Sequence, residues 1–138
     1  MDKIISFFCL LFLSPILLLT ATLLFLLYGR PVIFTQKRLG ENKLYFKIYK
    51  FRSMKRTQID KYNEFPDSSR LTPLYKIIRR FKIDELPQLA NILKGDMSFV
   101  GPRPWMPEAI ESFSIENEER FTVKPGLTGL SQINGNTH

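Results

Sequence analysis

The chain has 138 residues, and this length predicts a single domain. It carries one cysteine, Cys9, which excludes an intrachain disulfide and a cysteine metal site. The net charge of +7 is unevenly distributed, because only Lys3 of the 20 Lys and Arg residues precedes a long apolar run. Basic charge beside an apolar segment favours membrane lipids with anionic head groups as partners. Nucleic acid is not an expected partner, since no recognised nucleic-acid-binding pattern is present.

Residues 4–28 form the apolar run, which is rich in Leu and Phe and contains no charged residue. A straight helix of this length would measure roughly 37 Å, which is enough to span a bilayer. Ser14-Pro15 interrupts the run, because proline lacks an N–H, and the Ser14 hydroxyl is close enough to supply a hydrogen bond. The local sequence favours a kinked transmembrane helix over a helix-break-helix that enters and leaves by one face. The basic side of the run is expected to be cytoplasmic.

A β-hairpin is predicted after the apolar run. Residues 32–38 and 44–52 have strand character, and the glycine-containing segment 39–43 is a turn. One face of the second strand changes from apolar to cationic along its length; its residues are Leu44, Phe46, Ile48, Lys50 and Arg52. Lys50 and Arg52 are either solvated charges at a strand end or a pair of phosphate ligands at the rim of a core.

A polar segment, residues 53–69, leads from the hairpin to a predicted helix. Ser69 or Thr72 can cap this helix, and Pro73 suits its first turn. Its expected apolar stripe has helical spacing and consists of Leu74, Ile77, Ile78 and Phe81, with Arg79 and Arg80 outside the stripe.

Two adjacent carboxylates, Asp84 and Glu85, follow this helix. Asp84 is expected to be the N-cap of a short helix, because Pro87 fits a first turn, and Gly95 is expected to end it. Basic residues lie on both sides of the pair in sequence: Arg79, Arg80 and Lys82 before it, and Arg103 after it. Acids flanked by cations suit a site for Mg²⁺ and phosphate, in which an acid can also attack phosphorus. The alternative is structural: Asp84 caps the helix and Glu85 complements its dipole.

The C-terminal part contains a predicted helix and a loop. Residues 108–121 are expected to be helical, with Ile110 and Phe113 inward and an acidic outer face. Residues 123–129 form a turn-rich loop that carries Lys124 and two glycines, which allow close backbone approach to a ligand.

Taken together, these segments closely resemble the bacterial sugar transferase family, the monotopic polyprenyl-phosphate phosphoglycosyl transferases. The matching segments, in order, are FTQKRLG at 34–40, FKIYKFRSM at 46–54, IRR at 78–80, DELPQL at 84–89, residues 91–104 and residues 123–135. The resemblance implies an α+β, mostly helical fold with two parts. Residues 1–29 would be a re-entrant membrane helix broken at Ser14-Pro15, and residues 30–138 a cytoplasmic catalytic domain with a short β-hairpin and short helices.

The resemblance also implies the reaction. Asp84 would attack the β-phosphorus of a UDP-sugar, release UMP and form a phosphosugar-aspartyl enzyme, and undecaprenyl phosphate or another polyprenyl phosphate would then accept the phosphosugar. Asp84 and Glu85 would hold the required Mg²⁺. The phosphate-binding cations would be Lys50, Arg52, Arg79 and Arg103, with Arg80 and Lys124 as weaker candidates. The enzyme would lie at the bacterial inner membrane and begin a glycan precursor, such as an exopolysaccharide or lipopolysaccharide, for downstream glycosyltransferases.

Two departures from the family pattern accompany the resemblance. Where family members commonly carry GWAQVNGR, this chain reads GLSQINGN at 129–136, and it ends where they usually continue. The chain is therefore expected to be truncated at its C-terminus, and a non-catalytic membrane-anchored module that binds lipid phosphate or a partner enzyme is the alternative function. Contacts to the sugar would come from the loop after Arg103 or from the missing region.

Overall fold

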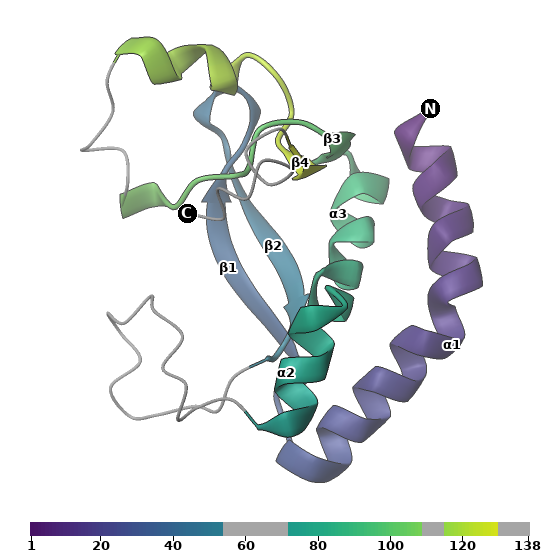
Figure 1. Cartoon of the computed structure of the whole chain (residues 1–138). Coiled ribbons are helices and arrows are strands. Elements are labelled where there is room, and N and C mark those ends of the chain that lie inside the picture. The colour runs from purple at the N-terminus through teal and green to yellow at the C-terminus, as the bar shows by residue number, and fades with distance from the viewer. Residues whose placement is uncertain (54–71, 109–114, 130–138) are drawn as a thin grey trace.

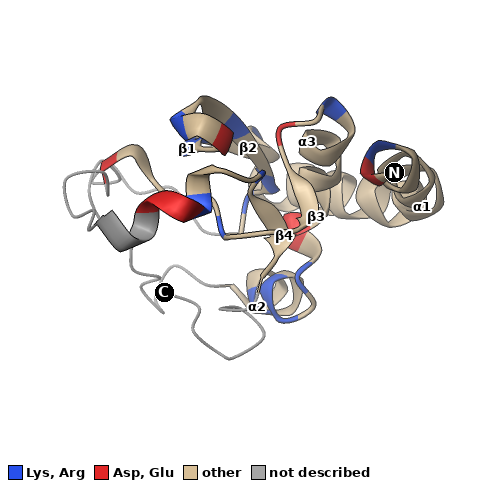
Figure 2. Cartoon of the chain, turned by 90° about the horizontal axis from the view of Figure 1, so that it is seen from above, with Lys and Arg blue, Asp and Glu red and all other residues tan. Residues whose placement is uncertain are grey.

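The computed structural model of the chain describes residues 1–53, 72–108 and 115–129. The α-helices are α1 (Asp2–Tyr28), α2 (Pro73–Arg80) and α3 (Leu89–Lys94), and the strands are β1 (Ile33–Leu39), β2 (Tyr45–Phe51), β3 (Ser98–Val100) and β4 (Gly126–Thr128). Three short 3-10 helices are η1 (Glu41–Lys43), η3 (Ile83–Gln88) and η5 (Ile115–Phe121). Helix α3 lies between α1 and the β1–β2 hairpin in Figure 1 and in the view from above in Figure 2, whereas α2 lies to one side of them in Figure 2. The described chain is mostly helical with one small hairpin, as predicted.

The apolar run forms one helix, α1, with Pro15 inside it. The helix is not interrupted at Ser14-Pro15, so the predicted break into two helices is wrong. Helix α1 instead changes direction part-way along its length (Figure 1), as the kinked alternative predicts. Proline at position 15 removes the donor that would bond the carbonyl of Leu11. The Ser14 hydroxyl donates to that carbonyl at 2.7 Å, which explains how the helix continues past the proline.

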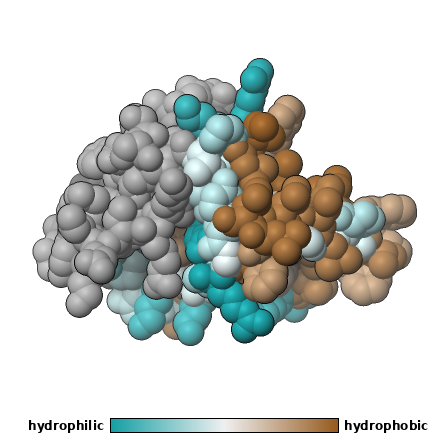
Figure 3. Space-filling model, turned by 90° about the horizontal axis from the view of Figure 1, so that it is seen from below, coloured by the Kyte–Doolittle hydropathy of each residue, from teal (hydrophilic) through white to brown (hydrophobic). Residues whose placement is uncertain are grey.

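One face of α1 packs along the rest of the chain, and the other face is exposed. Its N-terminal half contacts a core of Ile48, Leu89, Ile92 and Met97 through Cys9, Leu10 and Leu13. Its C-terminal half contacts a second core of Phe51, Tyr75 and Ile78 through Leu17, Ala21, Leu24 and Tyr28. Only 11% of the most apolar 18-residue stretch of α1 is buried, whereas the core helix of a soluble protein is mostly buried. Figure 3 shows the apolar surface gathered on one side of the molecule, a pattern that indicates membrane association.

The predicted hairpin is present. Strands β1 and β2 pair antiparallel, with Ile33 opposite Phe51 and Leu39 opposite Tyr45. Leu44 lies outside β2 and is 69% exposed, so its predicted place on the apolar face is wrong. The face that contacts the core is made by Phe46 and Ile48.

Helix α2 begins as predicted. The Thr72 side chain caps it by accepting from the Tyr75 N–H, and Pro73 occupies its first turn. The predicted apolar stripe is wrong in part, because Ile77 and Phe81 are exposed whereas Tyr75 and Ile78 are buried. The reason is the position of α1, whose Tyr28 ring stacks on Tyr75 with ring centroids 4.5 Å apart.

The Asp84 segment differs from its prediction. Asp84 is not an N-cap, because Lys82 adopts a left-handed conformation (φ 56°) and turns the chain directly from α2 into the first turn of η3. Both acids therefore lie inside the first turn of η3. Gly95 does end α3, with φ 97°, as predicted.

Sequence reasoning missed a short parallel pair, β3 with β4. The two glycines Gly101 and Gly126 allow it, because a Cβ at Gly126 would lie only 2.1 Å from the Gly101 backbone nitrogen. The close approach expected at the loop glycines is thus made at Gly126 by another backbone segment rather than by a ligand.

Part of the predicted acidic helix is a 3-10 helix, η5, with Phe121 buried. Ile110 and Phe113 lie outside the described residues, as do Ser69, most of the polar segment 53–69, and residues 130–138 with the altered end motif. Helix α1 ends next to the predicted boundary at residue 29, and the division into a membrane part and a cytoplasmic part stays a prediction.

Candidate active site

Asp84 is a buried carboxylic acid on the first turn of η3, and its side chain is 8% exposed. Within the part of the chain that the structure describes, its Oδ1 atom is buried and has no hydrogen-bond partner. Burial raises the pKa of Asp84, and the neighbouring charge of Glu85 raises it further, against the opposing effect of Lys50 and Arg79. The fold therefore buries one carboxylate oxygen without a partner from the described residues, and a cation, a water molecule or an incoming group can satisfy it.

Glu85 differs from Asp84 although the two are adjacent. Its Oε1 lies 2.9 Å from the ammonium of Lys50, and both side chains are largely buried. Burial by itself raises the pKa of Glu85, but Lys50, Lys82 and Arg103 outweigh it, and the pKa lies below its usual range. Glu85 is thus held ionised beside the less readily ionised Asp84.

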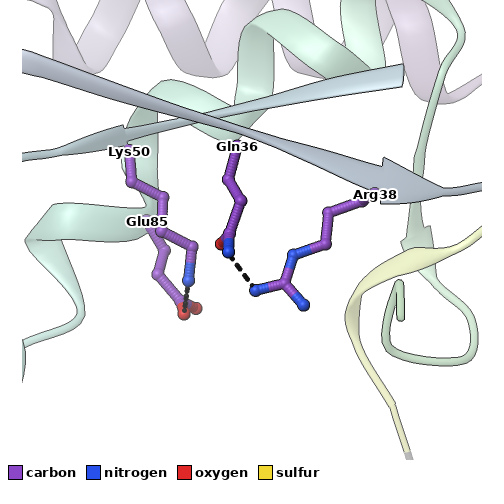
Figure 4. A network of polar contacts seen from close by, with 4 residues as sticks. All are labelled: Gln36, Arg38, Lys50 and Glu85. Carbon is purple, nitrogen blue, oxygen red and sulfur yellow. Dashed lines mark hydrogen bonds and ion pairs between the residues drawn. The ribbon is translucent and has the colours of Figure 1, made fainter. Parts of the chain in front are cut away.

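A narrow pocket adjoins Glu85, and Asp84, the preceding residue, is not among the described residues that line it. It is lined by two arginines, Arg38 and Arg103, together with Lys50, Glu85 and Gln88, and its remaining wall consists of Ile48, Pro104, Gly126 and Leu127. The Arg38 guanidinium donates to Gln36 Oε1 at 2.8 Å. Figure 4 shows both side chains on the same side of the hairpin as Lys50, and Glu85 of η3 lies on that side too. The pocket therefore combines cations from β1, β2 and the loop after β3.

Sequence reasoning missed Arg38 and Gln36. A signal was available, because residues at alternate positions of β1 share a face, and in the register Gln36 lies opposite Ile48 and Arg38 opposite Phe46. Extending the predicted face of the second strand across the hairpin would have placed Gln36 and Arg38 on the same face as Lys50.

The structure brings some predicted cations to the pair and not others. Lys50 and Arg103 line the pocket, and the charge of Arg79 acts on Asp84. In Figure 2 acidic positions in the middle of the molecule lie between basic positions on the hairpin and on α2. Arg80 and Lys124 are exposed.

Arg52 is placed elsewhere. Its guanidinium donates to the carbonyl of Tyr28 at 2.6 Å and approaches the carbonyls of Gly29 and Arg30 at 3.4 Å. Cations favour a helix C-terminus, because the last carbonyls there lack partners and carry partial negative charge. Arg52 therefore caps α1 rather than lining the pocket.

The donors at Asp84 and Glu85 fit a magnesium ion. Among the described residues no group of three or more His, Cys, Asp or Glu side chains could hold a metal. Mg²⁺ is commonly bound by one or two carboxylates together with substrate phosphates and water, so two acids are enough. The unpartnered Oδ1 of Asp84 is a suitable oxygen ligand.

Comparisons with known proteins identify the family of the chain. The family model described as bacterial sugar transferase matches residues 1–138. The chain belongs to the bacterial sugar transferase family. The pocket lined by Glu85, together with the adjacent Asp84, is the candidate active site that the geometry offers.

Curated relatives carry names that specify sugar transfer. An uncharacterized sugar transferase, EpsL of Bacillus subtilis, is 46% identical over 122 residues, which cover 88% of this chain and 60% of that protein. The UDP-glucose:undecaprenyl-phosphate glucose-1-phosphate transferase of Escherichia coli is 39% identical over 143 residues, covering 97% of this chain and 30% of that protein. A galactosyl transferase, CpsE of Streptococcus agalactiae, is 44% identical over 120 residues, covering 78% of this chain and 27% of that protein. The chain thus spans between about a quarter and three fifths of these relatives.

Proposed function

We propose that the chain is a phosphoglycosyl transferase that moves a sugar-1-phosphate from a UDP-sugar to polyprenyl phosphate, with undecaprenyl phosphate as the expected acceptor. The observation that carries the proposal is the buried, unpartnered Oδ1 of Asp84 beside a pocket of cations. Relatives named as undecaprenyl-phosphate phosphotransferases support the same reaction class.

Asp84 is the proposed nucleophile. Its Oδ1 forms a bond to the β-phosphorus of the UDP-sugar while the bond from that phosphorus to the bridging oxygen breaks, and UMP leaves with the bonding electrons. An oxygen of polyprenyl phosphate then attacks the same phosphorus and releases the Asp84 carboxylate. The product is a polyprenyl-diphosphate sugar, which downstream glycosyltransferases can extend into a glycan.

The cations supply charge neutralisation for this transfer. Phosphoryl transfer depends mainly on positioning and on stabilising charge over the phosphate oxygens. Lys50, Arg38 and Arg103 line the pocket and are the proposed phosphate ligands, and Arg79 is close enough to favour the ionised form of Asp84. Bound Mg²⁺ would neutralise the diphosphate and would be held by Asp84 and Glu85.

The packing of α1 supports a re-entrant membrane segment. Both halves of α1 contact cores that also contain residues of the remaining chain. At its N-terminal end Asp2 accepts a hydrogen bond from Ser98, and at its C-terminal end Tyr28 bonds Thr72 with 2.7 Å between the oxygens. A helix held at both ends by the same domain leaves both ends on that domain's side of the membrane. The basic charge of the domain favours the cytoplasmic face of the bacterial inner membrane.

Release of UMP tests the proposal. The chain in nanodiscs is given Mg²⁺, undecaprenyl phosphate and a panel of UDP-sugars, beside Asp84→Asn and the matched exposed control Glu119→Gln. We expect release that needs Mg²⁺, falls about 1,000-fold or more in Asp84→Asn and is unchanged in the control. Folded parent chain that releases no UMP with any donor would contradict the proposal and leave a non-catalytic lipid-phosphate module as the better account.

A further inference from the structure

A second pocket lies beside the pocket of the acid pair. It has a volume of about 450 Å³ and is lined by Gln36, Lys37, Tyr45, Pro107 and Glu108. Three of these residues come from the hairpin and two from the loop that follows Arg103. We call this space the outer pocket.

The pocket at the acid pair is too small for a sugar. Its volume is about 20 Å³, which is close to the space that one water molecule needs. A phosphate oxygen can enter such a space, but a pyranose ring cannot. A UDP-sugar with its β-phosphorus at Asp84 therefore needs another space for its ring.

The outer pocket is joined to the active site through specific contacts. Gln36 accepts a hydrogen bond from Arg38 at 2.8 Å through Oε1, and its Nε2 donates to the sulfur of Met106 at 3.2 Å. The Leu39 N–H donates to the carbonyl of Trp105 at 2.9 Å, which fixes the same loop against β1. One short segment thus carries Arg103 at the phosphate pocket and Glu108 at the outer pocket.

We propose that the outer pocket binds the sugar ring of the nucleotide-sugar donor and reads its hydroxyl groups, an inference that rests on the proposed function. Its side chains offer a carboxylate, an ammonium, an amide and a phenol. This mixture of donors and acceptors suits hydroxyls, which both donate and accept hydrogen bonds. Among the described residues Tyr45 is the only aromatic that lines the pocket, and it is 61% exposed, so this described lining offers no pair of rings to sandwich a nucleobase.

Sugar preference is the readout that tests this assignment. Glu108→Gln and Tyr45→Phe each remove one hydrogen-bonding function while keeping the side-chain shape, and Glu119→Gln is the matched exposed control. The kcat/KM of each variant is measured with two UDP-sugars that are epimers at one ring hydroxyl. Their ratio is taken within each variant, so a change in the folded fraction cancels. Competition by UMP reports the nucleotide end of the donor.

We expect Glu108→Gln or Tyr45→Phe to change the epimer ratio about tenfold, since losing a hydroxyl contact penalises one epimer more than the other. UMP inhibition and the Glu119→Gln ratio should stay at parent values. If the epimer ratio of both pocket variants stays within twofold of the parent ratio, this inference is contradicted and the proposed function is not. Weaker UMP inhibition with an unchanged ratio would also contradict it, because the pocket would then hold the nucleoside. A parent chain without UMP release would instead contradict the proposed function and this inference with it.

Discussion

The end of β2 supplies a cation to two polar regions of different character. Lys50 reaches the acid pair, whereas Arg52, two residues later, reaches the junction of α1 with α2. We define this junction by Arg52, Tyr28, Thr72 and Tyr75. Its contacts join one structural element to another: a guanidinium on helix carbonyls, two hydroxyls bonded at 2.7 Å and two stacked rings.

The acid pair uses its cation differently. Lys50 is bonded to Glu85, but Oδ1 of Asp84 has no partner among the described residues. A buried polar group without a partner costs about 1–3 kcal/mol of stability, and more when it is charged. The junction also holds buried atoms without a partner in the described chain, Arg52 Nε and the Tyr75 hydroxyl, but both residues make other contacts that join two elements. The acid pair differs because no described residue bonds to Asp84 Oδ1. We propose that the junction residues are structural and that the acid pair is catalytic.

Replacement of Lys50 should have the largest effect after replacement of Asp84. Lys50→Ala removes the partner of Glu85 and one proposed phosphate ligand, so we expect kcat/KM for UMP release to fall about 100- to 1,000-fold. The comparison is with Lys47→Ala, which changes an exposed lysine on the same strand. Activity of Lys50→Ala near the parent value would show that the pocket is not the reaction site.

Loss of Asn91 should damage the fold that holds the two regions together. Asn91 is fully buried, accepts from the Tyr49 N–H at 3.1 Å and donates to the Lys47 carbonyl at 2.7 Å, so it ties α3 to β2. Asn91→Leu leaves both backbone groups without this partner, and we expect a loss of about 2–4 kcal/mol in the free energy of unfolding. Denaturant unfolding in detergent measures it. A loss below about 0.5 kcal/mol would mean that water or rearrangement replaces these bonds.

Arg52→Ala should affect stability more than catalysis. Removing the cap of α1 is expected to cost about 1–2 kcal/mol, while kcat/KM per folded molecule stays within about threefold of the parent. Thermal unfolding and UMP release, measured on the same preparation, separate the two effects. If activity falls as far as in Lys50→Ala without a loss of stability, Arg52 belongs to the reaction site and the comparison between the two regions fails.

The exposed pair Lys43–Glu118 should matter least. Its atoms are 2.9 Å apart, but the side chains are 51% and 63% exposed. We expect Glu118→Gln to change the free energy of unfolding by about 0.5 kcal/mol or less, because water screens exposed pairs. Repeating the measurement in 0.5 M salt should reduce even this difference. A larger effect would show that η5 is held to the hairpin mainly by charge.

Local sequence signals predicted the local elements. Thr72 and Pro73 marked the start of α2, Gly95 marked the end of α3, and alternating residues marked the hairpin. The sequence also indicated a site at the adjacent acids, because Asp84 and Glu85 lie between basic segments. These features depend on residues a few positions apart, which is the range over which backbone preferences act.

Features that depend on distant contacts could not be predicted in this way. The parallel pair β3–β4 joins segments 28 positions apart in register, and each strand has three residues, too few to show a period. The left-handed Lys82 displaced Asp84 from the N-cap position, and nothing in its residue type required that conformation. The roles of Lys50 and Arg52 separated because one meets η3 and the other meets the end of α1, which alternation along β2 does not distinguish.

The mass of the intact protein tests the central claim most directly. The chain is incubated with Mg²⁺ and its UDP-sugar donor in the absence of polyprenyl phosphate, quenched and measured by mass spectrometry. The account predicts an added mass equal to one phosphosugar on the parent chain, its loss when polyprenyl phosphate is added, and no such addition on Asp84→Asn. An addition of equal size on Asp84→Asn would contradict the assignment of Asp84 as the nucleophile. UMP release by a parent chain that shows no added mass under any quench would contradict the covalent route.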